Sequence, residues 1–164
     1  MNRMRTTAAV LGAVGALTAT QLGLAGAASA APQAAGCPIE LSSPKNFTLD
    51  AKNRVQGGLY FALKNKSKTA SFKDVSLKVS KPVNLTFTYA TATKGSKITK
   101  RTSKVATVYT KTLKKKGTTG LRISAYMTNR KKPYEVRFTV HGKTAAGKTW
   151  GCAVDQGWWG SIKH

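Results

Sequence analysis

Residues 83–89 read VNLTFTY, and this stretch decides the expected fold. The apolar side chains of Val83, Leu85, Phe87 and Tyr89 alternate with asparagine and threonine. Side chains on a β-strand point alternately to opposite faces of the sheet. A period of two therefore predicts a strand with one face on a core and the other in water.

The same alternation recurs in seven further segments. They are residues 47–51, 59–63, 75–79, 105–109, 121–127, 134–140 and 150–154. Turn-prone segments separate them, at 65–71, 80–82, 94–96, 114–120, 129–133 and 142–147. No convincing 3.6-residue apolar stripe follows residue 30. About eight short strands of this kind predict an all-β, two-sheet antiparallel sandwich, with a barrel as the alternative.

Three consecutive stretches resemble bacterial extracellular immunoglobulin-like domains. Residues 58–65 (GLYFALKN) form a strand ending in asparagine, residues 73–79 (KDVSLKV) a valine-rich strand, and residues 82–87 (PVNLTF) a proline-led strand. The resemblance covers Phe47 to Val140. It implies an immunoglobulin-like sandwich used as a scaffold for spacing, adhesion or carbohydrate contact, and it transfers no functional residue.

The N-terminus has the layout of a secretory signal peptide. Arg3 and Arg5 precede an uncharged stretch from residue 8 to about residue 24, and Ala28 and Ala30 stand at the two small-residue positions of a cleavage site. We therefore expect three parts. They are a cleaved signal peptide at residues 1–30, a flexible N-terminal segment at 31–44 and a single basic β-sandwich domain at 45–164. Such a protein is expected to be secreted, and to be extracellular or associated with the cell wall.

Two cysteines, Cys37 and Cys152, lie near opposite ends of the exported part. An even cysteine count in an exported protein predicts a disulfide. In one alternative, Cys37 carries a lipid, because small residues precede it as they do in bacterial lipoproteins. In another, the two cysteines form a metal site with His141 and His164, although the close pairing of zinc ligands is missing. We expect no metal and no cofactor.

The residues do not favour an enzyme. The chain has five acidic residues, scattered over five segments, and two histidines. Catalysis by paired carboxylates needs two acids close together, and a serine or cysteine nucleophile needs a base. No nucleophile elbow, phosphate-binding glycine loop or His-Glu-x-x-His motif occurs. We therefore expect a non-enzymatic protein.

The charge is the strongest functional indication. Lysine and arginine together number 28 against five acids, a formal net charge of +23, and lysine predominates. Lysine ammonium groups attract polyanions without fixing a bidentate geometry. Lysines on loops and edge strands also keep β-proteins soluble, but that role does not require so few acids. The candidate polyanion-binding residues are Lys64, Lys66, Lys68, Lys94, Lys97, Lys100, Arg101, Lys104, Lys111, Lys114, Lys115, Lys116, Arg130, Lys131 and Lys132.

Two adjacent tryptophans near the C-terminus, Trp158 and Trp159, form a candidate ligand platform. Neighbouring residues on an extended strand face opposite sides, so both rings do not easily enter one core. One of them is then free to contact a sugar ring or a lipid interface. The alternative is that both close the open end of the sandwich. Trp150 alternates with Cys152 and is expected in the core.

These observations predict a secreted cationic binding module that attaches to anionic cell-envelope or matrix polymers. The expected partner is a cell-wall phosphate polymer, an acidic polysaccharide or an anionic lipid surface, and nucleic acid is bound only non-specifically. One alternative is an antimicrobial or toxin-like protein acting on membranes. Another is an inhibitor that inserts a rigid loop, such as residues 129–133, into an extracellular enzyme.

Overall fold

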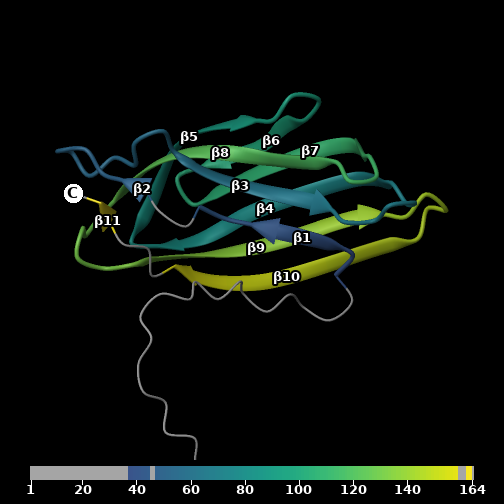
Figure 1. The fold of residues 1–164 in the computed structure, drawn as a ribbon. Coiled ribbons are helices and arrows are strands. Elements are labelled where there is room, and N and C mark those ends of the chain that lie inside the picture. The colour runs from purple at the N-terminus through teal and green to yellow at the C-terminus, as the bar shows by residue number, and fades with distance from the viewer. Residues whose placement is uncertain (1–36, 45–46, 159–161, 164) are drawn as a thin grey trace, which may run out of the picture.

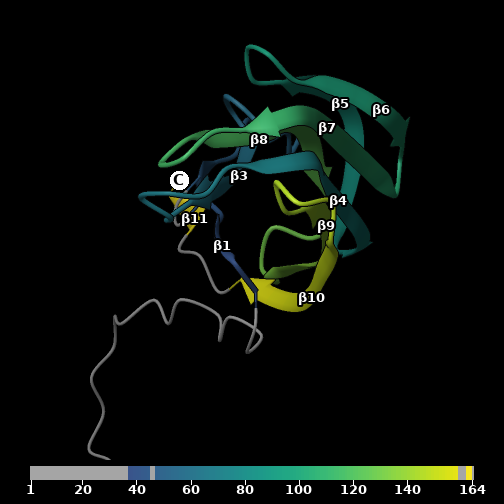
Figure 2. The same ribbon diagram turned by 90° about the vertical axis from the view of Figure 1, so that its right-hand side faces the viewer.

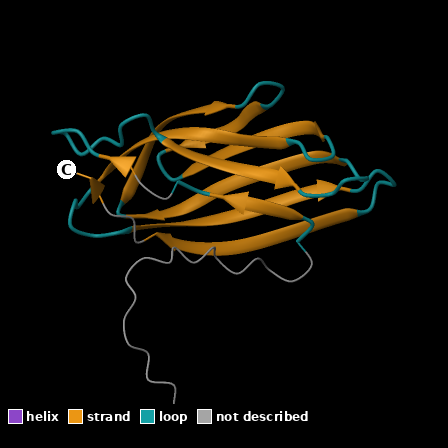
Figure 3. Cartoon of the chain, viewed as in Figure 1, coloured by secondary structure: helices purple, strands orange, loops and turns teal. Residues whose placement is uncertain are grey.

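The computed structural model describes residues 37–44, 47–158 and 162–163, and these contain strands and no helix (Figure 3). None of these residues forms a helix able to cross a membrane. The strands are β1 (Ile39–Ser42), β2 (Phe47–Thr48), β3 (Leu59–Asn65), β4 (Phe72–Val83), β5 (Leu85–Ala92), β6 (Lys97–Thr102), β7 (Val105–Leu113), β8 (Thr118–Met127), β9 (Tyr134–Lys143), β10 (Thr149–Trp158) and β11 (Ile162–Lys163).

Two antiparallel sheets pack face to face (Figures 1 and 2). One sheet has the order β1-β3-β8-β5 and the other the order β10-β9-β4-β7-β6. A short parallel pair, β11 with β2, lies beside them. The expected all-β antiparallel sandwich is confirmed. Each of the eight expected segments contains a strand, and β1, β6 and β11 are additional.

The core lies between the two sheets, as the alternation predicts. On β3, Leu59, Phe61 and Leu63 are fully buried, and β4 and β9 contribute residues such as Leu77 and Phe138 from the facing sheet. The rings of Phe61 and Phe138 are 5.3 Å apart, centroid to centroid, and so join the sheets directly. Burying each such side chain contributes about 1.5–3 kcal/mol, so this interior provides most of the driving force for folding.

The stretch 83–89 is not one strand, which corrects the sequence prediction. Val83 ends β4 in the five-stranded sheet, whereas Leu85 begins β5 in the four-stranded sheet. The chain crosses between the sheets at Asn84, whose φ of 56° asparagine adopts more readily than most residues. Val83 is consequently 55% exposed. A register shift between Phe87 and Tyr89 then turns Tyr89 outward, so that it is 53% exposed.

The expected turn at residues 80–82 is also wrong, because β4 continues through it. A register shift between Ser80 and Val83 and a φ of 50° at Lys81 mark a bulge at this point. A bulge places an extra residue in one strand without ending it. The proline and lysine that suggested a turn therefore occupy an irregular strand end.

Two of the three additional strands, β6 and β1, were missed for different reasons. β6 exposes nearly all of its side chains, so it shows no apolar alternation. β1 has four residues and falls in the segment 31–44 that was expected to be flexible. Ile39 on β1 is only 2% exposed, and β1 pairs along its length with β3. The ordered domain therefore begins before residue 45.

The Cys37–Cys152 disulfide is present, with the two Cα atoms 5.7 Å apart. Cys37 lies two residues before β1 and Cys152 lies on β10, so the bond connects the start of one sheet's edge strand to the edge strand of the other sheet. Neither cysteine is free, which contradicts both the lipid-anchor and the metal-site alternatives. Trp150 on β10 packs at the rim of the core against Phe72, with the ring centroids 5.2 Å apart.

Candidate functional site

The loops at one end of the sandwich collect many of the predicted cationic residues. The β3–β4 loop and the β7–β8 turn meet there, on the right in Figure 1. We call this the Asn65 end, after the buried residue that joins the two loops. The predicted residues at or next to it are Lys64, Lys66, Lys68, Lys111, Lys114, Lys115 and Lys116.

Asn65 holds the two lysine-bearing loops together. Its side chain is completely buried, and its Nδ2 donates to Ala70 O at 2.9 Å in one loop and to Lys114 O at 3.1 Å in the other. Its Oδ1 accepts a hydrogen bond from Ser67 N at 3.0 Å. Lys116 N also donates to Ser67 O at 3.1 Å. The backbones that carry the lysines are therefore fixed side by side while the ammonium groups extend into solvent.

The opposite end carries a second, smaller group of cations. Asn84 Nδ2 donates to the carbonyl oxygens of Asn129 and Lys132 at 2.9 and 2.7 Å, which orders the β8–β9 loop containing Lys131. Arg130 is half-buried there and donates from Nη2 to Asp50 O at 3.1 Å. Part of its guanidinium therefore holds the neighbouring backbone in place. Lys104 lies in the β6–β7 turn.

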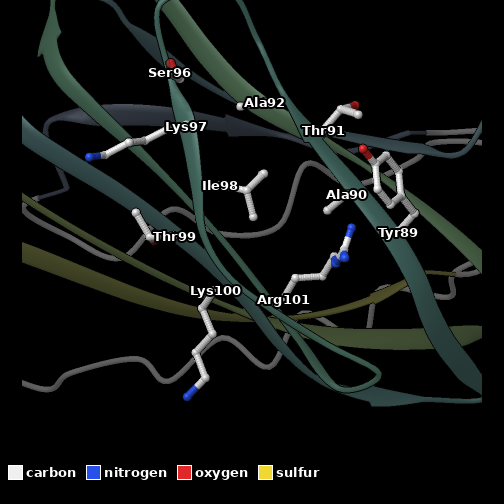
Figure 4. Close-up of a pocket in the computed structure, with 10 residues that line it drawn as sticks. All are labelled: Tyr89, Ala90, Thr91, Ala92, Ser96, Lys97, Ile98, Thr99, Lys100 and Arg101. Atoms are coloured by element: carbon white, nitrogen blue, oxygen red, sulfur yellow. The ribbon is translucent and has the colours of Figure 1, made fainter.

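The remaining predicted cations lie along the β5–β6 hairpin. Lys94 is in its turn, and Lys97, Lys100 and Arg101 are on the exposed edge strand β6. The latter three line an open groove of about 610 Å³ between β5 and β6 (Figure 4). Arg101 lies over the ring of Tyr89, 4.7 Å from its centroid. The predicted cations therefore form three separate groups: one at each end of the sandwich and one along the β5–β6 hairpin at its edge.

Acidic side chains leave this positive surface largely uncompensated. Glu40 binds Lys66 at 3.3 Å, and Asp50 binds Arg54 at 2.6 Å. Asp74 accepts from Tyr109 Oη at 2.7 Å and from Lys143 Nζ at 3.0 Å. Within the described part of the chain, no ion pair with an acid engages Lys68, Lys114, Lys115 or Lys116.

Two of these carboxylates make the stability of the fold depend on pH. The hydrogen bond from Tyr109, followed by that from Lys143, lowers the pKa of Asp74, and the backbone N–H of Arg54 lowers the pKa of Asp50. A lowered pKa stabilises the fold above the unfolded value of about 3.9, and this stability is lost as the pH falls through the folded value.

We therefore expect the free energy of unfolding to decrease as the pH falls below about 4. The Asp74→Asn variant should show a shallower decrease, because its side chain does not titrate. Urea unfolding at a series of acidic pH values measures both curves. Parallel curves for the variant and the wild type would contradict a contribution from Asp74.

The tryptophan platform stays a prediction. Trp158 is the last residue of β10, and Trp159 lies outside the described residues.

The sequence prediction missed the tyrosines whose rings contact cations on the surface. Lys97 lies 5.6 Å from the centroid of the Tyr109 ring, and Arg122 lies 5.6 Å from that of Tyr60. Each pair joins neighbouring strands, so no spacing along one strand indicates it.

The shape of the domain has counterparts among solved structures. The collagen-binding subdomain of the Enterococcus faecalis surface protein ACE superposes with a TM-score of 0.50 at 9% identity, covering 72% of this chain and 94% of that one. The fold of this chain is therefore similar to that of a bacterial surface adhesin domain. A collagen-binding domain from a Staphylococcus aureus adhesin gives a TM-score of 0.40 at 12% identity, covering 71% and 97% of the two chains.

At such identities the likeness concerns the immunoglobulin-like adhesin fold and no individual site residue. The chain matches no known family by sequence, and no curated protein matches it.

Proposed function

We propose that this protein is an exported, non-enzymatic binding module that attaches to anionic polymers of the cell envelope or matrix. The Asn65 end makes the main contact. The observation that carries the proposal is the pair of lysine loops that the buried Asn65 side chain joins. Fixing their backbones lowers the entropy lost when several ammonium groups engage one polymer.

Export is supported by two features of the chain. The N-terminal sequence has the layout of a signal peptide, and disulfides persist mainly in oxidising compartments outside the cytosol. The adhesin-type fold accords with a surface role, since the E. faecalis protein with this fold is a collagen-binding surface protein.

Co-sedimentation with purified cell walls over a salt series tests the function. We expect most of the protein to sediment with walls at about 20 mM salt and little at about 500 mM, because salt screens contacts between solvent-exposed charges. Absence of binding at low salt would contradict the proposal. Leakage from anionic liposomes at the same protein concentration would instead support the membrane-active alternative.

Two variants of equal charge test the position of the contact. Lys68, Lys114, Lys115 and Lys116 are replaced by glutamine in the first, and Lys52, Lys104, Lys131 and Lys132 in the second. All eight side chains are exposed. The first variant should bind walls at least about tenfold more weakly than the second, since multivalent contacts are lost together. Equal losses would show that net charge alone matters.

A further inference from the structure

The β5–β6 hairpin opens into a groove because its two strands join different sheets. Ser96 N donates to Thr93 O at 3.0 Å and closes the turn. From there β5 pairs with β8 and β6 pairs with β7, and no ladder joins β5 to β6 in the described part of the chain. At the other end, Phe87 N donates to Ser103 O at 3.0 Å. Between these two points the strands leave the open space shown in Figure 4.

The β5 side of this groove offers backbone donors. Thr93 N donates to Gly120 O, so the peptide groups of residue 93 face β8. Because backbone groups alternate along a strand, those of Ala92 and Ala90 point away from β8 and toward the groove. Two N–H groups on the same edge are about 7 Å apart, twice the rise per residue. Ala90 is 5% exposed and Ala92 is half-buried, and both residues line the groove.

The β6 side offers a guanidinium held in place. Arg101 crosses toward Tyr89 and lies over its ring (Figure 4), a contact that restricts the guanidinium plane and leaves N–H groups at its edge. A guanidinium edge binds two oxygens of one anionic group at once. No aspartate or glutamate is among the residues that line the groove. The groove therefore offers hydrogen-bond donors to an oxyanion, and no carboxylate in its lining competes for the Arg101 guanidinium.

We propose that this groove binds consecutive phosphate groups of an extended polyol phosphate chain. In poly(glycerol phosphate), six backbone bonds separate successive phosphorus atoms, as many as in two residues of a peptide. When both chains are extended, the phosphates recur at about the interval of the Ala90 and Ala92 N–H groups, roughly 7 Å. Arg101 binds one phosphate through two hydrogen bonds. The inference rests on the proposed function and names the polymer class.

The test compares two charge-conserving variants on two polymers. Arg101→Lys keeps the charge but loses the bidentate edge. Arg122→Lys is the matched control, because Arg122 is also stacked on a tyrosine, Tyr60, but does not line the groove. The probes are poly(glycerol phosphate) and hyaluronate, which carries one carboxylate for every two sugar rings. Isothermal titration calorimetry at one salt concentration gives each affinity.

We expect Arg101→Lys to weaken binding of poly(glycerol phosphate) about tenfold and binding of hyaluronate less than twofold. Arg122→Lys should change neither affinity. Ala92→Pro, which removes one groove N–H, should reproduce the Arg101→Lys result if its circular dichroism matches that of the wild type. Unchanged binding in Arg101→Lys, or equal losses on both polymers, overturns the groove assignment alone. Failure of the wild type to bind either polymer overturns the proposed function as well.

Discussion

Replacing both Cys37 and Cys152 by alanine should lower the free energy of unfolding by about 4–5 kcal/mol. The two residues are 115 positions apart in the chain, so the bond closes a loop over nearly the whole domain. Cross-linking such a loop removes conformational freedom from the unfolded chain, and the effect grows with the logarithm of loop length. A loss of this size is comparable to the whole stability of many small domains.

Urea unfolding of the wild type, the double variant and the reduced wild type measures this effect. The reduced protein and the double variant should agree within about 1 kcal/mol, since both lack the same cross-link. In the structure the bond ties the segment just before β1 to β10, so amide exchange on β1 should increase most. A loss below about 1 kcal/mol would mean that packing alone holds the sheet edges together.

Replacing Asn65 by alanine should cost about 2–4 kcal/mol of stability and weaken wall binding as well. The substitution removes the Nδ2 donor from the carbonyl oxygens of Ala70 and Lys114, and removes the Oδ1 acceptor from Ser67 N. Buried groups left without partners carry the full cost of their desolvation. The two loops should then separate, and their lysines should no longer act together.

Asn65→Asp distinguishes hydrogen bonding from simple loss of volume. Asparagine and aspartate have nearly the same shape, but an ionised carboxylate does not donate and would face carbonyl oxygens in a buried site. We expect this variant to be less stable than Asn65→Ala at pH 7, with part of the loss recovered at pH 4. Thermal unfolding at both pH values measures this. Equal stability of Asn65→Asp and wild type at pH 7 would show that the donor has no role.

The alternation of apolar and polar residues predicts which side chains are buried only where a strand is regular. Leu59, Phe61 and Leu63 face the core, as their alternation predicts. Val83 and Tyr89 follow the same alternation but are exposed, because a sheet crossing and a bulge intervene. Where a bulge forms depends on how the strand pairs with its partner strand, which is distant in sequence. The period alone therefore does not reveal them.

The candidate site shows the same limit. The lysines were identified from composition, but Asn65 was assigned only to a turn and Arg101 was one cation among fifteen. Asn65 acts through carbonyls about five and nearly fifty residues away, and Arg101 through Tyr89 on another strand. Such contacts exist only after the sheets have formed. No spacing rule within one segment predicts them.

The sequence by itself determined eight of the eleven described strands, most turns, the two-sheet class and the excess of positive charge. These follow from local alternation, turn chemistry and composition, which act between near neighbours. Tertiary structure alone decided at which residue the stretch 83–89 divides between the sheets, which lysine loops meet at Asn65, and that the β5–β6 hairpin opens into a groove. The physical reason is that strand pairing and the meeting of side chains depend on contacts between segments far apart in the chain. The energy of such a contact depends on both segments, so neither segment alone predicts it.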